Sequence, residues 1–160
     1  MTGEIHHIEL YVSDVKIHDK PHTLVCGNLE HPKNKCQLNY VLKCIVAHCF
    51  FDLQKSIEFW GWLLEKLGYK QYQTFEKGQS WKLGETYLVF VQVEEKYSDV
   101  NYHRKRTGLN HVAFRVNGEE LAEFRIALLE REIILLYEDK FGDKLFFEDP
   151  DRIKIELAVY

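Results

Sequence analysis

The chain has 160 residues, 46% of them hydrophobic, which is typical of one globular domain with its own core. Its formal net charge is −4 and its only basic cluster lies at 102–106, which excludes the broad basic surface of a nucleic-acid-binding domain. The sequence opens without a secretory pattern, and Lys43 and His48 interrupt its longest apolar run. We therefore expect a cytoplasmic protein without a membrane span.

The first predicted element is a strand in "IHHIELYVSD", residues 5–14. Its residues alternate in polarity, as they do in a strand with one buried face. The core face would carry Ile8, Leu10 and Val12, and the opposite face would carry His7, Glu9 and Tyr11. By the same alternation, we expect His6 on the face opposite His7.

Residues 15–52 differ sharply from the rest of the chain, since they hold all four cysteines and four of the eight histidines. The cysteines form no C-x2-C pair, so a zinc module is disfavoured. We interpret the segment as an insertion with a short strand or helix near 40–51. Because "YVSD" and "LQKSIEFW" would join directly without it, a gene-level accident such as a translated intron is an alternative.

The next element is a predicted amphipathic helix over 53–68, ending at Gly68. Its apolar face consists of Ile57, Trp60, Leu64 and Leu67. Three short strands should follow, the last within 83–92.

A second strand–helix–strand series starts at "NHVAFRV". Val112, Phe114 and Val116 would face the core, with His111, Ala113 and Arg115 opposite. A predicted helix over 119–132 buries Leu121, Phe124 and Leu128, and three strands should follow it, the last within 147–156.

The two series form an internal repeat. Removing 15–52 reduces the separation of His7 and Gln92 from 85 residues to 47, close to the 45 that separate His111 and Glu156. The sequence thus predicts an α+β fold of two βαβββ modules, residues 1–95 with the insertion 15–52, and residues 107–160. Together they would form a single domain, a cup-shaped, partly open barrel.

Four residues at equivalent places of this repeat are candidate metal ligands: His7, Gln92, His111 and Glu156. Two imidazoles, an amide oxygen and a carboxylate suit a divalent ion such as Zn, Ni, Co, Mn or Fe. Each also has a structural interpretation. A lone histidine is more often a hydrogen-bonded core residue, and Gln92 can close its strand. Glu156, in an apolar strand, must face solvent, pair with a cation or bind metal.

The sequence resembles the vicinal oxygen chelate superfamily, which includes glyoxalase I, bleomycin-resistance proteins, fosfomycin-resistance enzymes and extradiol dioxygenases. The resemblance rests on "HIELYVSD", "KSIEFWGWLLEKLGY", "GLNHVAFRV" and "FEDPDRIKIEL". It implies metal ligands at the first and last strands of each module, which fall on His7, Gln92, His111 and Glu156. Gln92 stands where many active members have Glu or His.

The resemblance implies a lyase, isomerase or dioxygenase that chelates vicinal oxygens of a small substrate, with Glu156 as the general base. Candidate substrate-binding residues are Glu9, Tyr11, Arg115, Tyr102 and Arg104. Two rivals remain open: a metal-free binding protein of the bleomycin-resistance kind, and an inactive paralogue disrupted by its insertion. A short segment before the last strands favours the first rival, because similar proteins often carry a longer loop over the site there. The resemblance also makes a homodimer an expectation.

Overall fold

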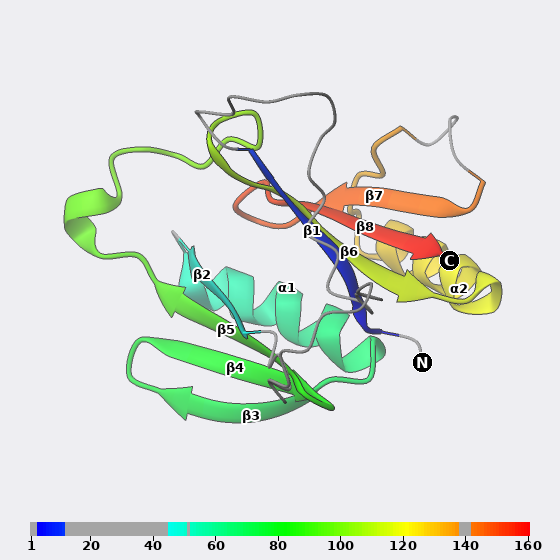
Figure 1. Ribbon diagram of the computed structural model, residues 1–160, viewed down its shortest axis with the longest axis horizontal. Helices are drawn as coiled ribbons and strands as arrows, with labels where there is room; N and C mark the ends of the chain where they lie inside the picture. The colour runs from blue at the N-terminus through cyan, green and yellow to red at the C-terminus, as the bar shows by residue number, and fades with distance from the viewer. Residues whose placement is uncertain (1–2, 12–44, 51, 138–141) are drawn as a thin grey trace, which may run out of the picture.

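The computed structural model describes residues 3–11, 45–50, 52–137 and 142–160, with the backbone alone for 7–11 and 45–50 (Figure 1). Eleven elements follow one another in this part of the chain: β1 Ile5–Tyr11, β2 Ile45–Phe50, α1 Leu53–Lys66, β3 Lys70–Phe75, β4 Gly78–Leu83, β5 Thr86–Gln92, the 3₁₀ turn η1 Glu95–Tyr97, β6 Gly108–Val116, α2 Gly118–Glu130, β7 Lys144–Glu148 and β8 Lys154–Val159. None of the helices described is long and apolar enough to cross a membrane.

The strands form two four-stranded sheets, in the orders β1-β6-β8-β7 and β2-β5-β4-β3. Helix α1 lies behind β2 and β5, and α2 lies behind β7 and β8 (Figure 1). The sheets are separate, so they do not close into a barrel. This confirms the predicted α+β fold of glyoxalase type.

Capping residues define the end of helix α1 and the start of helix α2. Gly68 has a φ of +88°, and the N–H groups of Gly68 and Tyr69 donate to the carbonyls of Glu65 and Leu64. This is a Schellman motif, which needs a residue that tolerates the left-handed region. Helix α2 begins with a capping box between Asn117 and Glu120.

Aromatic side chains of α1 join the two sheets. The Trp60 ring lies 5.2 Å from the Phe90 ring of β5 and 6.5 Å from the Phe114 ring of β6, centroid to centroid. Each of these three residues is no more than 3% exposed. The predicted core faces of both helices are confirmed, since Leu64, Leu67, Leu121, Phe124 and Leu128 are all buried and Ile57 packs against the core.

The first strand and the insertion take unexpected places. Strand β1 pairs antiparallel with β6, whereas β2, from the insertion, pairs in parallel with β5. Thus β2 has the place that the repeat assigns to the first strand of module one. The expectation of a short strand near 40–51 is confirmed, and the module boundaries stay a prediction.

Of the three strands predicted after the second helix, the described residues contain two in full. They contain two strands, β7 and β8, and one isolated bridge from Leu136 to Phe146. Glu132 and Tyr137, on either side of the bridge, have positive φ values of 58°, which the extended backbone of a strand does not allow.

Candidate functional site

The candidate site lies on one face of the β1-β6-β8-β7 sheet, which we call the site face. The opposite face carries Phe114, Ile155 and Leu157, which are buried in the core. The register aligns His111 with Lys154 and Glu148 in one cross-strand row of the site face. It aligns Ala113 with Glu156 and Phe146 in the next row. Parallel and antiparallel neighbours in register point to the same side of a sheet.

His111 and Glu156 face each other at the centre of this face. His111 Nε2 lies 3.2 Å from Glu156 Oε2, and the two residues are 5% and 3% exposed. Two neighbouring ligand atoms at about 2.1 Å from one ion lie roughly 3.0–3.4 Å apart. The pair therefore has the spacing of two ligands of a single metal ion.

Asn110 fixes which nitrogen of His111 carries a proton. Its Nδ2 donates to the carbonyl of Arg104 at 3.0 Å, so its Oδ1 is the atom that lies 2.8 Å from His111 Nδ1. Since an amide oxygen only accepts, His111 Nδ1 donates. Nε2 then faces Glu156 Oε2. Two acceptor atoms repel each other at this distance, so either a proton on Nε2 or a cation bound to both atoms is required between them.

The second oxygen of Glu156 has protein partners. Lys144 Nζ and the Tyr160 hydroxyl each donate to Oε1 at 2.9 Å. Burial acts to raise the pKa of Glu156, but the hydrogen bonds from His111, Lys144 and Tyr160 outweigh it and hold that pKa at about 2. The same hydrogen bond to Glu156 raises the pKa of Lys144. Glu156 is thus an ionised carboxylate beside an ammonium group.

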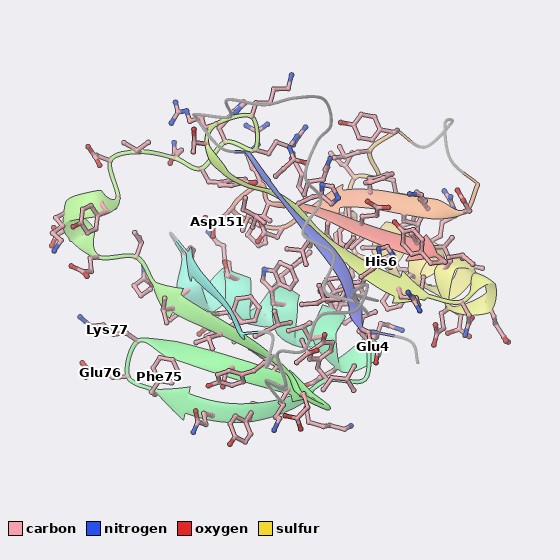
Figure 2. The ribbon with its side chains drawn as sticks, viewed as in Figure 1. Glu4, His6, Phe75, Glu76, Lys77 and Asp151 are labelled. Atoms are coloured by element: carbon pink, nitrogen blue, oxygen red, sulfur yellow. The ribbon has the colours of Figure 1, made fainter. Side chains whose placement is uncertain are left out.

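His6 belongs to this cluster, so the prediction that it lies away from the site is wrong. Its ring stacks on that of Tyr160, with the centroids 3.7 Å apart, at the end of β8 (Figure 2). The register of β1 shifts between Ile5 and His7, which breaks the strict alternation that the prediction assumed. Burial first, and then the charge of Arg115, lower the pKa of His6.

The backbone register places two of the predicted first-strand residues beside positions of the same face. His7 pairs with Ala113, whose other neighbour is Glu156, and Glu9 pairs with His111. Tyr11 pairs with Gly108 at the end of the strand. His7 and Glu9 thus pair with site-face positions, whereas Tyr11, beyond a register shift, pairs with a position that has the parity of the core residues of β6. The roles of all three stay predictions.

Gln92 lies in the other sheet, at the end of β5. Alternation along the strand puts it on the same face as Leu88 and Phe90, which are buried in the core. Phe90 stacks on Trp60 of α1. Glu156 has the parity opposite to the buried core positions of β8. Gln92 also lines two surface hollows, one of them beside residues 52–55 at the start of α1. Gln92 thus shares the parity of the core positions of its strand, and its metal ligation stays a prediction.

The remaining predicted substrate-binding residues lie at different places. Arg115 follows Ala113 on the site face, and its buried Nε has no hydrogen-bond partner among the described residues. The Tyr102 hydroxyl donates to the carbonyl of Leu109 at 2.7 Å, and burial raises its pKa to about 12. Arg104 is ion-paired with Glu148. Tyr102 and Arg104 therefore belong to the loop that leads into β6.

The described side chains provide part of a metal site. Among them, no three His, Cys, Asp or Glu residues converge as ligands. His111 and Glu156 supply two correctly spaced donor atoms, and β1 brings His7 to the same sheet. The donor types of these two residues suit a borderline divalent ion, so they fit the metal that the resemblance implies.

The fold and this site define an α+β protein with two four-stranded sheets and a histidine–carboxylate pair on one sheet face. No family model matches the sequence. The chain is 44% identical over 115 residues to the uncharacterized protein YqjT of Bacillus subtilis (strain 168). The aligned region covers 67% of this chain and 90% of the relative. It is 42% identical to a Bacillus halodurans protein provisionally described as a glyoxalase, with a TM-score of 0.72 over 75% of this chain and 96% of the other.

Two more distant structures share the fold. Lactoylglutathione lyase from Agrobacterium tumefaciens has a TM-score of 0.54 at 14% identity, covering 78% of this chain and 96% of the other. The fosfomycin resistance protein FosX from Listeria monocytogenes has a TM-score of 0.54 at 17% identity, covering 72% of this chain and 87% of the other. The chain belongs to the vicinal oxygen chelate superfamily.

Proposed function

We propose that this protein is a glyoxalase-like enzyme that uses a divalent metal ion to act on a small substrate with two adjacent oxygen atoms. The observation that carries the proposal is the buried His111–Glu156 pair, whose Nε2 and Oε2 atoms lie 3.2 Å apart. His7 and Gln92 are the further ligands proposed from the sequence. When bound, the ion would supply a Lewis acid for a carbonyl or enediol oxygen.

The residues around the pair have distinct tasks in this proposal. Asn110 holds the Nδ1–H of His111, so that Nε2 stays directed at the carboxylate. Glu156 is the proposed general base. A carboxylate with a pKa of about 2 is a weak base, so its hydrogen bond to Lys144 must lengthen for it to accept a proton from substrate. Lys144 therefore controls the basicity of Glu156.

Metal titration tests the proposal. We expect Ni²⁺, Co²⁺, Zn²⁺ or Mn²⁺ to bind with one-to-one stoichiometry in isothermal titration calorimetry. The variants His111→Ala and Glu156→Gln should each weaken that binding at least about tenfold, because each loses one ligand atom. Lys70→Met, on the exposed strand β3 of the other sheet, is the control and should bind as the wild type does. Absence of binding by all four ions would refute the proposal.

A second candidate function is supported by the contact between Lys144 and Glu156. The Lys144 ammonium lies 2.9 Å from Glu156 Oε1 and supplies a positive charge to the same carboxylate, at the oxygen that does not face His111. A metal-free protein that binds a small molecule on this face would use that arrangement unchanged. If the metal-dependent enzyme is correct, Lys144→Met should strengthen metal binding about tenfold, because a like charge is removed. If the second candidate is correct, Lys144→Met should bind no metal either.

Lys154→Met is a matched control for Lys144→Met. Lys154 is on the same face, one strand away, with its Nζ 5.6 Å from the centroid of the Phe146 ring. It contributes the same charge from the next strand, over an aromatic ring. A specific effect of Lys144 requires that Lys154→Met leave metal affinity within about twofold of the wild type.

A further inference from the structure

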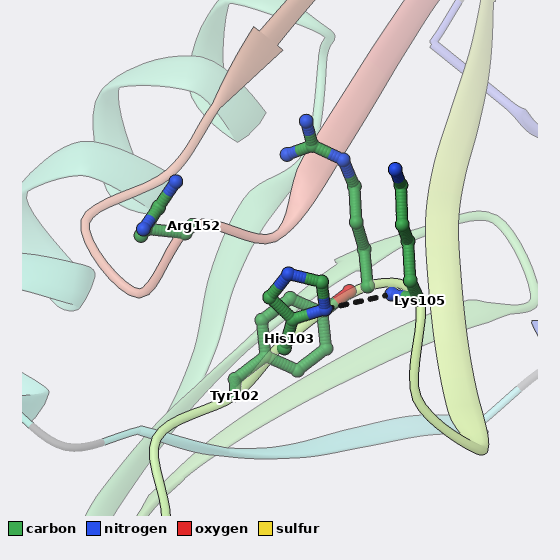
Figure 3. Close-up of a pocket in the computed structure, with 5 residues that line it drawn as sticks. Tyr102, His103, Lys105 and Arg152 are labelled. Atoms are coloured by element: carbon green, nitrogen blue, oxygen red, sulfur yellow. Dashed lines mark hydrogen bonds between the residues drawn. The ribbon is translucent and has the colours of Figure 1, made fainter.

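A positively charged hollow lies where the loop before β6 meets the turn between β7 and β8. It has a volume of about 140 Å³ and is lined by Tyr102, His103, Arg104, Lys105 and Arg152 (Figure 3). Arg152 lies across the hollow from His103 and Lys105 (Figure 3). Four of the five lining side chains carry N–H donors, and three are permanent cations at neutral pH.

Nearby acids partly balance this charge. Glu148 Oε1 is ion-paired with Arg104, and Glu148 Oε2 lies 3.7 Å from Nε of Arg152. Three lining cations against the Glu148 carboxylate leave an excess of about two positive charges on the lining, which the more buried Asp149 carboxyl, whose charge also acts on Tyr102, reduces in part. An excess of this size matches a doubly charged anion better than a singly charged one.

The loop that forms the hollow is held by its own hydrogen bonds. The Tyr102 hydroxyl is anchored to the carbonyl of Leu109 at 2.7 Å, so the ring serves as a wall. The backbone N–H of Lys105 donates to His103 Nδ1 at 3.2 Å, and the backbone N–H of Arg106 donates to the carbonyl of His103 at 2.9 Å. The loop backbone and the Tyr102 ring are therefore held in place before any ligand binds, which reduces the entropy cost of ordering the loop.

The hollow is connected to the candidate metal site. Glu148, which holds Arg104, lies in the same cross-strand row as His111, two strands away. Two interstrand spacings are about 10 Å. In addition, the amide of Asn110 contacts both the Arg104 carbonyl and His111 Nδ1. A ligand in the hollow would thus lie within reach of a small molecule bound at His111.

We propose that this hollow binds the phosphate or phosphonate group of the substrate. This inference rests on the proposed function for the reacting end of the substrate, and it assigns the substrate class: a small compound with adjacent oxygen atoms and a terminal, doubly charged oxyanion. Arg104 and Arg152 supply planar donors for its oxygens, and Lys105 supplies a point charge.

Titration with inorganic phosphate at constant ionic strength and pH 7.5, without metal, tests the inference. Calorimetry and amide NMR shifts of residues 102–106 and 152 are the readouts. We expect saturable one-to-one binding, and the double variant Lys105→Met/Arg152→Met should weaken it at least about tenfold, because two charge-assisted contacts are lost. The control, Lys70→Met/Lys77→Met, removes the same charge from exposed positions in the other sheet and should bind like the wild type.

Three results would overturn the inference: no saturable phosphate binding, an equal loss in the control double variant, or acetate binding as tightly as phosphate. The Ni²⁺ titration of the same preparations separates this inference from the proposed function. Metal binding without phosphate binding refutes the oxyanion site alone. Phosphate binding without metal binding refutes the metal-dependent enzyme and supports the site.

Discussion

Asp149 gives a quantitative test of how this fold is held together. It is 5% exposed and follows β7, where its Oδ2 accepts the Trp60 Nε1–H at 2.9 Å. Its Oδ1 accepts the backbone N–H groups of Asp151 and Ile153 at 2.9 and 2.8 Å. Asp149 thereby connects α1 to the turn between β7 and β8.

Burial raises the pKa of Asp149 from 3.8 to about 7, against the opposing effect of its hydrogen bonds. The folded protein then keeps this proton up to about pH 7, whereas the unfolded chain releases it near pH 3.8. The contribution to stability is complete below pH 3.8 and is lost as the pH rises through 7. The difference between the unfolded pKa of 3.8 and the folded pKa of about 7 implies that the free energy of unfolding falls by about 2 kcal/mol between pH 5 and pH 7.

The variant Asp149→Asn should remove this pH dependence. The asparagine oxygen can still accept the two backbone N–H groups, but its NH₂ would meet the N–H of Trp60, at a cost of about 1–3 kcal/mol near pH 5. The difference in unfolding free energy between wild type and variant should therefore shrink by about 2 kcal/mol from pH 5 to pH 7.

Urea unfolding followed by circular dichroism at pH 5, 6 and 7 measures this difference. Circular dichroism is preferable to fluorescence because Trp60 contacts the mutated group. All other ionisable groups are common to both proteins, so their contributions cancel in the comparison. A difference that stays constant within about 0.5 kcal/mol over this range would refute the reasoning, since Asp149 would then titrate alike in the folded and unfolded chains.

Three further predictions follow from single contacts. Asn110→Ala should weaken Ni²⁺ binding about 10–100-fold in calorimetry, because the neighbouring histidine loses the acceptor that orients it. Tyr160→Phe should raise the pKa of Glu156, observed by ¹³C NMR of its carboxyl group, and cost about 1 kcal/mol of stability above pH 4.5, a loss that disappears on acidification. Gly68→Ala should lower the unfolding free energy by about 1 kcal/mol, because the φ of +88° is unfavourable for a residue with a Cβ. Steric clash adds little to this loss, since the Cβ would contact only Leu83, at 3.9 Å.

Each of these predictions has a contrary outcome. Unchanged Ni²⁺ affinity in Asn110→Ala would show that the amide does not orient its neighbour. A constant Glu156 pKa in Tyr160→Phe would remove the hydroxyl from the causes of that shift. Gly118→Ala is the control for Gly68→Ala, since its backbone is not in the left-handed region and a Cβ there would meet nothing within 4 Å. Equal losses in both glycine variants would contradict the backbone argument.

The amino-acid sequence by itself determined the helices, their buried faces and the fold class. Apolar residues at helical spacing made Trp60, Leu64 and Leu128 core residues, and Gly68 marked where the first helix ends. These are local properties, set by backbone conformation within a few residues. The sequence also limited Glu156, in an apolar strand, to facing solvent, pairing with a cation or binding metal.

The tertiary structure alone decided which strand lies beside which, and therefore which residues reach the site. Strand β1 joins the sheet of β6, and β2 takes its predicted place beside β5. A one-residue change of register reverses the face on which a side chain lies. The bulge in β1 therefore allows His6 to stack on Tyr160. Gln92 alternates in phase with Phe90, whose ring packs on Trp60 of α1. Strand pairing depends on hydrogen bonds between distant segments, and no local pattern in the sequence encodes its register.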